Sequence, residues 1–148
     1  MIALLDAPFE PAEALKRFEA DAVGAGAIVS FSGHVRPQAA SGPVTSLYLQ
    51  AHSPLTERGI EAAADTARER WPLTSLAILH RTGKMAPGEA IVFVATASAH
   101  RRAAFEAADY LMDYLKTEAV FWKKETGPRG EAWIEPRGED YADRRRWG

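Results

Sequence analysis

The run Ala90–Thr96 is the feature that most constrains how this chain can fold. It reads AIVFVAT, so apolar residues fill every position before the final threonine. A strand whose residues are apolar on both of its faces has both faces buried, and it therefore belongs in the interior of a sheet. The sequence predicts a central strand at these residues.

Further strands are predicted from alternation and from β-branched or aromatic content. Residues Val44–Ala51 alternate apolar and polar side chains, which is typical of a half-buried strand. Near the C-terminus, two apolar segments flank the turn residues Thr126–Gly130 and predict a hairpin. The remaining predicted strands, including the two of the hairpin, are Ile2–Leu5, Ala27–Ser32, Leu76–His80, Val120–Glu125 and Ala132–Glu135.

Three segments have the 3.6-residue periodicity of helices: Pro11–Ala22, residues 54–70 and Arg101–Leu115. For the second we expect Ser53 to be the N-cap, with Pro54 in the first turn. Helices alternate with strand pairs, so the predicted class is α+β: a mixed, largely antiparallel sheet, three helices and a C-terminal hairpin. We expect one domain over residues 1–148, with a polar, mobile tail from about residue 138.

Composition excludes several classes of protein. The formal net charge is −2, whereas a general nucleic-acid binder is usually basic. The chain has no cysteine, which removes disulfides and thiolate chemistry. No phosphate-binding glycine motif is present, and the four histidines lack the spacing of a metal site, so we expect no metal and no cofactor. No membrane span or signal peptide is apparent, so a soluble, cytoplasmic protein is expected.

The helix Arg101–Leu115 ends in a lysine of unusual placement. Counting 100° per residue, Lys116 lies within roughly 40° of Met112 and Phe105. It therefore adjoins the expected apolar stripe, and its side chain should be partly buried or reach along apolar surface. One interpretation is a lysine that complements the helix dipole. The other is a lysine with a lowered pKa that acts as a nucleophile or base. The apolar stripe is Ala104, Phe105, Ala108, Leu111, Met112 and Leu115.

Two other basic clusters allow the same choice between a structural and a functional role. In the strand Val120–Glu125, Lys123 shares a face with Phe121 and Lys124 shares the other face with Trp122. Both lysines could simply protect an edge strand. His100 and Arg101 open a helix, where free N–H groups and arginine can bind an anion, or where the side chains can merely be solvated.

Taken together, the motifs along the chain resemble those of the large, catalytic subunit of molybdopterin synthase. The combination of the motifs SAHR, DYLKT and FWK, at their distances along the chain, is the specific part of this resemblance. The motifs are Phe31–Arg36 (FSGHVR), Arg70–Leu73 (RWPL), His80–Gly83 (HRTG), Pro87–Glu89 (PGE), Ile91–Val94 (IVFV), Trp133–Glu135 (WIE), Ser98–Arg101 (SAHR), Asp113–Thr117 (DYLKT) and Phe121–Lys123 (FWK).

The resemblance implies an α/β-hammerhead-like fold and a sulfurtransferase. Its expected reaction is the insertion of two sulfurs into cyclic pyranopterin monophosphate, which gives the dithiolene of molybdopterin. The sulfur is expected to arrive as a thiocarboxylate on the C-terminal glycine of a small ubiquitin-like subunit. The implied assembly is a homodimer of this chain with a small subunit at each end, hence a heterotetramer, and no nucleic acid or membrane is involved.

The resemblance also implies roles for individual residues. Lys116 and Lys123 match the family's catalytic lysines. Arg36, His100 and Arg101 match residues proposed to hold the phosphate and pterin of the substrate. Arg137 matches a pocket arginine that the family can supply from the other protomer of the dimer.

Two alternative functions are compatible with the residues alone. One is a non-catalytic module that binds phosphate or another anion through the basic clusters. The other is a purely structural partner of a ubiquitin-like protein. The net charge of −2 disfavours the first, and the constellation of His100, Lys116 and Lys123 disfavours the second.

Overall fold

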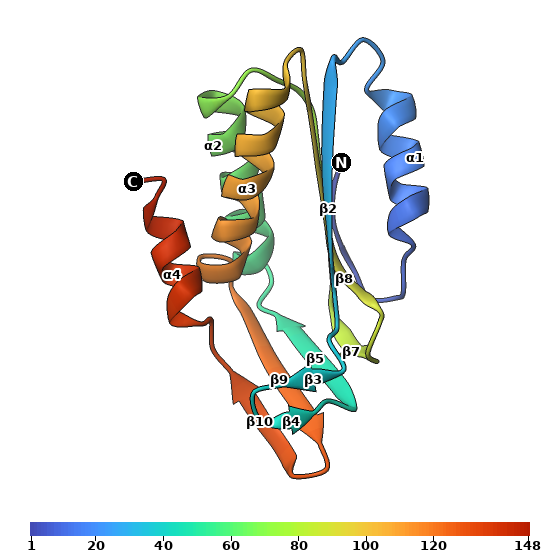
Figure 1. Cartoon of the computed structure of the whole chain (residues 1–148), viewed down its shortest axis with the longest axis vertical. Helices are drawn as coiled ribbons and strands as arrows, with labels where there is room; N and C mark the ends of the chain where they lie inside the picture. Colours follow the sequence, from blue (N-terminus) through green and yellow to red (C-terminus); the bar gives the residue numbers. More distant parts are fainter.

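The computed structural model describes residues 1–148 as two four-stranded sheets, a short hairpin and four helices (Figure 1). The predicted α+β class is confirmed. The helices are α1 (Pro11–Asp21), α2 (Leu55–Arg70), α3 (Arg101–Thr117) and α4 (Gly138–Arg145). The strands are β1 (Ile2–Leu5), β2 (Ala27–His34), β3 (Gln38–Ala39), β4 (Gly42–Pro43), β5 (Ser46–Ala51), β6 (Leu73–Arg81), β7 (Gly83–Met85), β8 (Ala90–Ser98), β9 (Phe121–Gly127) and β10 (Gly130–Ile134).

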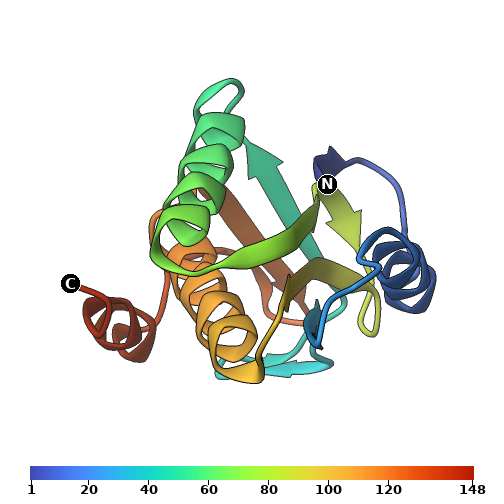
Figure 2. The ribbon, with the colours of Figure 1, turned by 90° about the horizontal axis from the view of Figure 1, so that it is seen from above.

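The first sheet has the strand order β1-β6-β8-β2, with β1 parallel to β6 and the other pairs antiparallel. Strand β8, which contains the apolar run, lies inside the sheet as predicted, and Ile91 is its only residue that is not fully buried. Helices α2 and α3 cover one face, and α1 covers the other (Figure 2). In β6, Leu76 and Ile78 therefore face α2 and α3, whereas Ala77 and Leu79 face α1.

The second sheet, with the order β10-β9-β5-β7, differs from the single sheet that the sequence predicted. Strand β6 ends at Arg81 and β7 begins at Gly83, so the chain passes from one sheet to the other within two residues. Gly83 has a φ of +88°, a conformation that L side chains rarely adopt. This turn joins the first sheet to the second.

Helix α2 begins differently from the prediction. Its N-cap is Pro54, and no side chain caps it. Instead, the buried hydroxyl of Thr56 accepts a hydrogen bond from the His52 N–H and donates one to the Val120 carbonyl. Ser53 is not the cap, because the Thr56 N–H that a cap at this position would bind donates instead to the His52 carbonyl, at 3.0 Å.

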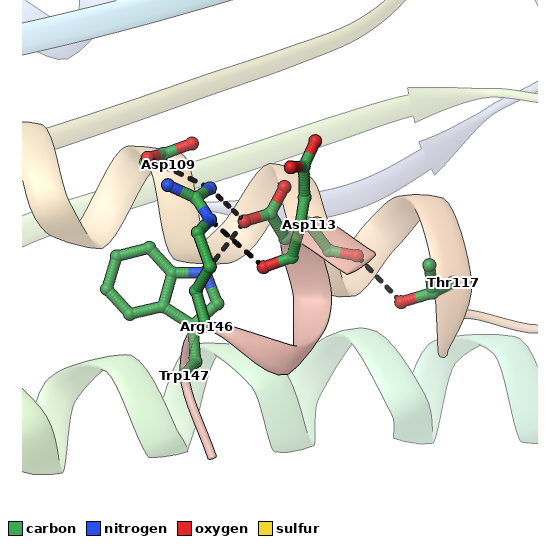
Figure 3. A network of polar contacts seen from close by, with 6 residues as sticks. Asp109, Asp113, Thr117, Arg146 and Trp147 are labelled. Atoms are coloured by element: carbon green, nitrogen blue, oxygen red, sulfur yellow. Dashed lines mark hydrogen bonds and ion pairs between the residues drawn. The ribbon is translucent and has the colours of Figure 1, made fainter. Parts of the chain in front are cut away.

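Helix α4 occupies the segment for which the sequence predicted a polar, mobile tail (Figure 1). Following this helix, Trp147 packs edge-on against Trp71 and Tyr110. Asp113 on α3 accepts hydrogen bonds from the Arg146 guanidinium (2.6 Å) and from the Trp147 indole (2.7 Å), as Figure 3 shows. These contacts come from side chains distant in sequence, and periodicity within the tail does not reveal them.

None of the helices combines the length and the apolar character that crossing a lipid bilayer requires.

Candidate active site

A cleft opens between the C-terminal end of α3, the loop after β2 and the second sheet. It has two adjoining lobes, of about 190 and about 290 Å³. Together they fall within the size range of pockets that hold small molecules, about 300–1,000 Å³. The lobes share seven residues, which are His34, Arg36, Ile91, Leu115, Lys116, Lys123 and Arg137.

Lys123 enters the cleft because strand β9 alternates. Phe121 and Lys123 face the cleft, whereas the Trp122 side chain points away and remains 54% exposed. Burial, and after it the neighbouring charge of Lys116, lower the pKa of the Lys123 ammonium to about 8. At pH 7, about a tenth of Lys123 is therefore a neutral amine, and this fraction rises steeply as the pH approaches 8.

Lys116 reaches the cleft from the last turn of α3. Leu115 beside it is buried, and Met112 one turn earlier is half-buried. The side chain of Lys116 is itself exposed and lines both lobes. The sequence placed this lysine at the margin of the buried stripe of α3, and the structure agrees. Phe105, expected within that stripe, is instead 59% exposed.

Two arginines complete the cationic lining. Arg36 follows β2 and is exposed to both lobes. Arg137 is the N-cap residue of α4, where its backbone N–H donates to Asp140 and its guanidinium pairs with the same carboxylate at 3.3 Å. The resemblance allowed Arg137 to come from another protomer. In the structure the chain's own Arg137 lines the cleft, since α4 docks on α3.

His100 and Arg101 do not join this group. Both are exposed at the N-terminal end of α3, while Lys116 is at the C-terminal end. Fifteen residues of helix separate Arg101 from Lys116, about 22 Å at 1.5 Å per residue. Within one chain, the six predicted site residues therefore form a group of four and a distant pair.

The chemistry available in the cleft follows from these groups. Four cationic side chains can hold an anion such as a phosphate or carboxylate. The lysine of lowered pKa can accept or release a proton near neutral pH. The first lobe also contains the carboxylates Glu125, Glu135 and Asp140, so the second lobe is the more cationic of the two.

Comparisons with known proteins agree with this picture. Residues 4–118 match the model of a family described as MoaE protein. The chain belongs to the MoaE family. The molybdopterin synthase catalytic subunit of Caulobacter vibrioides is 50% identical, over 99% of this chain and 97% of that protein. The corresponding subunit of Pseudomonas aeruginosa is 46% identical over the same shares. The solved molybdopterin biosynthesis MoaE protein from Burkholderia ambifaria has a TM-score of 0.84 and 39% identity, covering 100% of this chain and 97% of that one.

Membership of the MoaE family makes the chain an enzyme subunit of the molybdopterin synthase type, in molybdenum cofactor biosynthesis. The family model ends at residue 118, so it includes Arg36 and Lys116 but neither Lys123 nor Arg137. The relatives from Caulobacter and Pseudomonas align over almost the whole chain, including the hairpin and α4.

Sequence reasoning missed one residue of the MoaE cleft, His80. His80 lies in the family motif HRTG and is among the histidines without metal spacing, but no role in the site was expected for it. Its side chain is buried in β6 and lines the second lobe, and its ring stacks on Phe121 at 4.0 Å between centroids. The period-2 pattern of β6 could have revealed it, because His80 is on the same face as Leu76 and Ile78 and thus faces the side that α3 covers.

Proposed function

We propose that this chain transfers sulfur to cyclic pyranopterin monophosphate, in the cytoplasm, and so forms the dithiolene of molybdopterin. Two sulfurs come in turn from the C-terminal thiocarboxylate of a small ubiquitin-like subunit. The observation that carries the proposal is the convergence of Lys116, Lys123, Arg36 and Arg137 on one cleft. These residues match the family motifs, and their chemistry suits an anionic substrate and an acyl-bound sulfur donor.

In the proposed reaction, the thiocarboxylate sulfur is the nucleophile that adds to a carbon of the pterin side chain, and elimination of an oxygen substituent from that carbon completes the substitution. Lys116 lies beside the thiocarboxylate carbonyl in this scheme and polarises it. Lys123 moves protons, because its pKa of about 8 allows both the amine and the ammonium near neutral pH. Water then cleaves the bond between the acyl carbon and the sulfur, which leaves sulfur on the pterin and a carboxylate on the small subunit.

Arg36 and Arg137 supply the charge that holds the phosphate in this scheme. Arg36 is exposed in a loop and can reach the anion freely, whereas Arg137 is oriented by its contacts with Asp140. The tail of the small subunit would end beside Lys116, where the cleft is open.

The distant pair His100 and Arg101 supports a homodimer as the working form. Strand β2 is an edge strand, and its residues Ser30, Phe31 and Ser32 are exposed. At one end of β2, Ala27 pairs with Ser98, which is near His100 in the sequence. The other end of β2 leads to Arg36. If two copies paired antiparallel along β2, His100 and Arg101 of each copy would approach the cleft of the other. We propose this dimer, with a small subunit at each end, as the heterotetrameric assembly.

The test is Lys116→Ala, assayed with a thiocarboxylated small subunit and the pyranopterin substrate. We expect dithiolene formation to fall at least about 100-fold, in the range typical of a lost acid–base or electrostatic group. Lys124→Ala is the matched control. Lys124 also belongs to β9 but contacts Tyr48, Trp133 and Glu131 outside the cleft, so its loss should leave turnover unchanged.

Arginine exchange separates the proposed enzyme from an anion-binding module. Lys123→Arg keeps the positive charge but cannot release a proton near neutral pH. The enzyme should lose turnover while it retains substrate binding. Near-normal turnover in both Lys116→Ala and Lys123→Arg would overturn the proposal.

A further inference from the structure

The second lobe of the cleft is lined by side chains that are almost all hydrogen-bond donors or apolar. Its nitrogen-bearing residues include four cations that can only donate, Arg36, Lys116, Lys123 and Arg137. No carboxylate lines it. Apart from the minor amine form of Lys123, two histidines are therefore its only side chains with a nitrogen or oxygen acceptor.

One of these histidines is already occupied. Nδ1 of His34 lies 3.1 Å from the Gly88 carbonyl, and its Nε2 lies 3.1 Å from the Ser32 hydroxyl. His80 is different. Its Nδ1 lies 3.0 Å from the Arg81 carbonyl, whereas its Nε2 has no partner within the chain. His80 thus supplies the one side-chain acceptor in this lobe that is free to bind a ligand whatever the charge of Lys123.

The protonation of His80 is set by its surroundings. A carbonyl oxygen can only accept, so Nδ1 carries the proton and Nε2 is left with a lone pair. Burial, together with the charges of Lys123 and Lys116, lowers the pKa of the His80 imidazole to about 4. The ring is therefore a neutral acceptor throughout the physiological pH range.

The position of His80 is as restricted as its protonation. Its side chain is only 4% exposed. The ring stacks on Phe121 with an interplanar angle of 18°, and Phe121 is two residues before Lys123 on β9. Because the ring of His80 is held in place and its tautomer is fixed, its Nε2 is an acceptor of fixed direction in the second lobe.

We propose that His80 is a substrate-binding residue whose Nε2 accepts a hydrogen bond from an N–H or O–H group of the pterin. This inference rests on the proposed function, because a pterin offers ring and amino N–H donors in the same molecule as a phosphate. Cations alone would hold many phosphorylated compounds. A ligand without a donor would leave the His80 acceptor buried and unpaired, which disfavours its complex. The acceptor therefore discriminates between a pterin and other phosphorylated compounds.

The experiment compares His80→Phe with the unaltered protein. Phenylalanine keeps an aromatic ring to stack on Phe121 but has no acceptor. We expect the affinity for cyclic pyranopterin monophosphate to fall about 10- to 100-fold, in keeping with a lost specific contact. Affinity for inorganic phosphate, which needs only the cations, should remain unchanged. Both are measured by calorimetry on the assembled enzyme.

A second pair of variants keeps the test decisive if His80→Phe does not fold. In His80→Gln the longer side chain can return an amide oxygen near the position of Nε2, whereas in His80→Asn the shorter one cannot. We expect His80→Gln to recover part of the pterin affinity and His80→Asn not to. Pterin affinity that is unchanged in His80→Phe or in His80→Asn would overturn the inference, and so would an equal loss of pterin and phosphate binding.

Failure of this inference differs from failure of the proposed function. An unaltered enzyme that forms no dithiolene contradicts the proposed function. An unaltered enzyme that turns over, together with a His80→Phe variant of equal pterin affinity, contradicts only the role of His80.

Discussion

Lys123 occupies a place where its positive charge is costly. It is half-buried, it faces a second ammonium at Lys116, and the nearest compensating charge comes from Asp140 on α4. In an unfolded chain its pKa would be near 10.5, whereas in the folded protein it is about 8. Between these pH values the unfolded state binds more protons, so Lys123 makes the protein more stable as the pH rises from about 8 to 10.5.

The first residue-scale prediction concerns this coupling. In Lys116→Ala, the pKa of Lys123 should rise, because a positive charge that opposes protonation has been removed. The measurement is an NMR titration of the lysine side-chain signals in the unaltered protein and in the variant. Lys124→Ala is the control, since Lys124 pairs with Glu131 outside the cleft and should leave the Lys123 titration unchanged.

The same pKa sets the expected pH profile of the reaction. If the Lys123 amine takes up the proton, turnover should increase with pH and level off above about 8. A Lys123 titration that does not respond to the loss of Lys116 would show that the two side chains are not coupled. Turnover that does not change with pH around 8 would contradict the proton-transfer role proposed for Lys123.

At the scale of elements, α3 both supports the core and organises the site. Its buried residues Ala104, Ala107 and Leu111 pack on the first sheet, and its last turn carries Lys116. Asp113, on the same helix, anchors the segment after α4 through Arg146 and Trp147 (Figure 3). One helix therefore positions Lys116 directly and Arg137 indirectly.

The element-scale prediction is that Trp147→Ala loosens α4. The variant loses the packing on Trp71 and Tyr110 and the hydrogen bond to Asp113. We expect the free energy of unfolding to fall by about 2 kcal/mol, less than for a fully buried tryptophan. The KM for the pterin should rise as well, because Arg137 is the N-cap of α4.

Chemical denaturation and steady-state kinetics measure the two effects. Arg145→Ala is the control, since Arg145 is an exposed residue of the same helix and should change neither quantity. A Trp147→Ala variant with reduced stability but an unchanged KM would show that the docking of α4 does not position Arg137 for the substrate.

The sequence predicted an element well where one local pattern determines it. It predicted poorly the features that depend on contacts between elements. The run Ala90–Thr96 could only be an interior strand, and β8 confirms it. Phe105 has helical periodicity with the buried stripe of α3, yet its side chain is exposed. Periodicity gives the direction of a side chain on its own helix but not how far the neighbouring sheet extends.

For the whole molecule, the separation of His100 from the cleft leads to a test of the proposed dimer. Lys116→Ala and His100→Ala chains should each be inactive alone. After they are mixed, half of the dimers are hybrids, and one of the two clefts in each hybrid combines an intact Lys116 with an intact His100. Recovery of about a quarter of the unaltered activity is therefore expected.

The matched control mixes Lys116→Ala with Lys123→Ala. Both lysines line the cleft of their own chain, so every cleft in the hybrid lacks one of them, and no recovery is expected. Absence of recovery in the first mixture as well would contradict a cleft shared between two copies.

The sequence by itself determined the α+β class, the interior strand β8, the long helix α3 and the lysine at its end, because periodicity and turn chemistry are local properties. It also identified the MoaE family through its motifs. Only the tertiary structure decided that α4 docks on α3, that Arg137 lines the cleft of its own chain and that His80 faces the two lysines. These outcomes depend on contacts between residues far apart in the chain, which local patterns do not record.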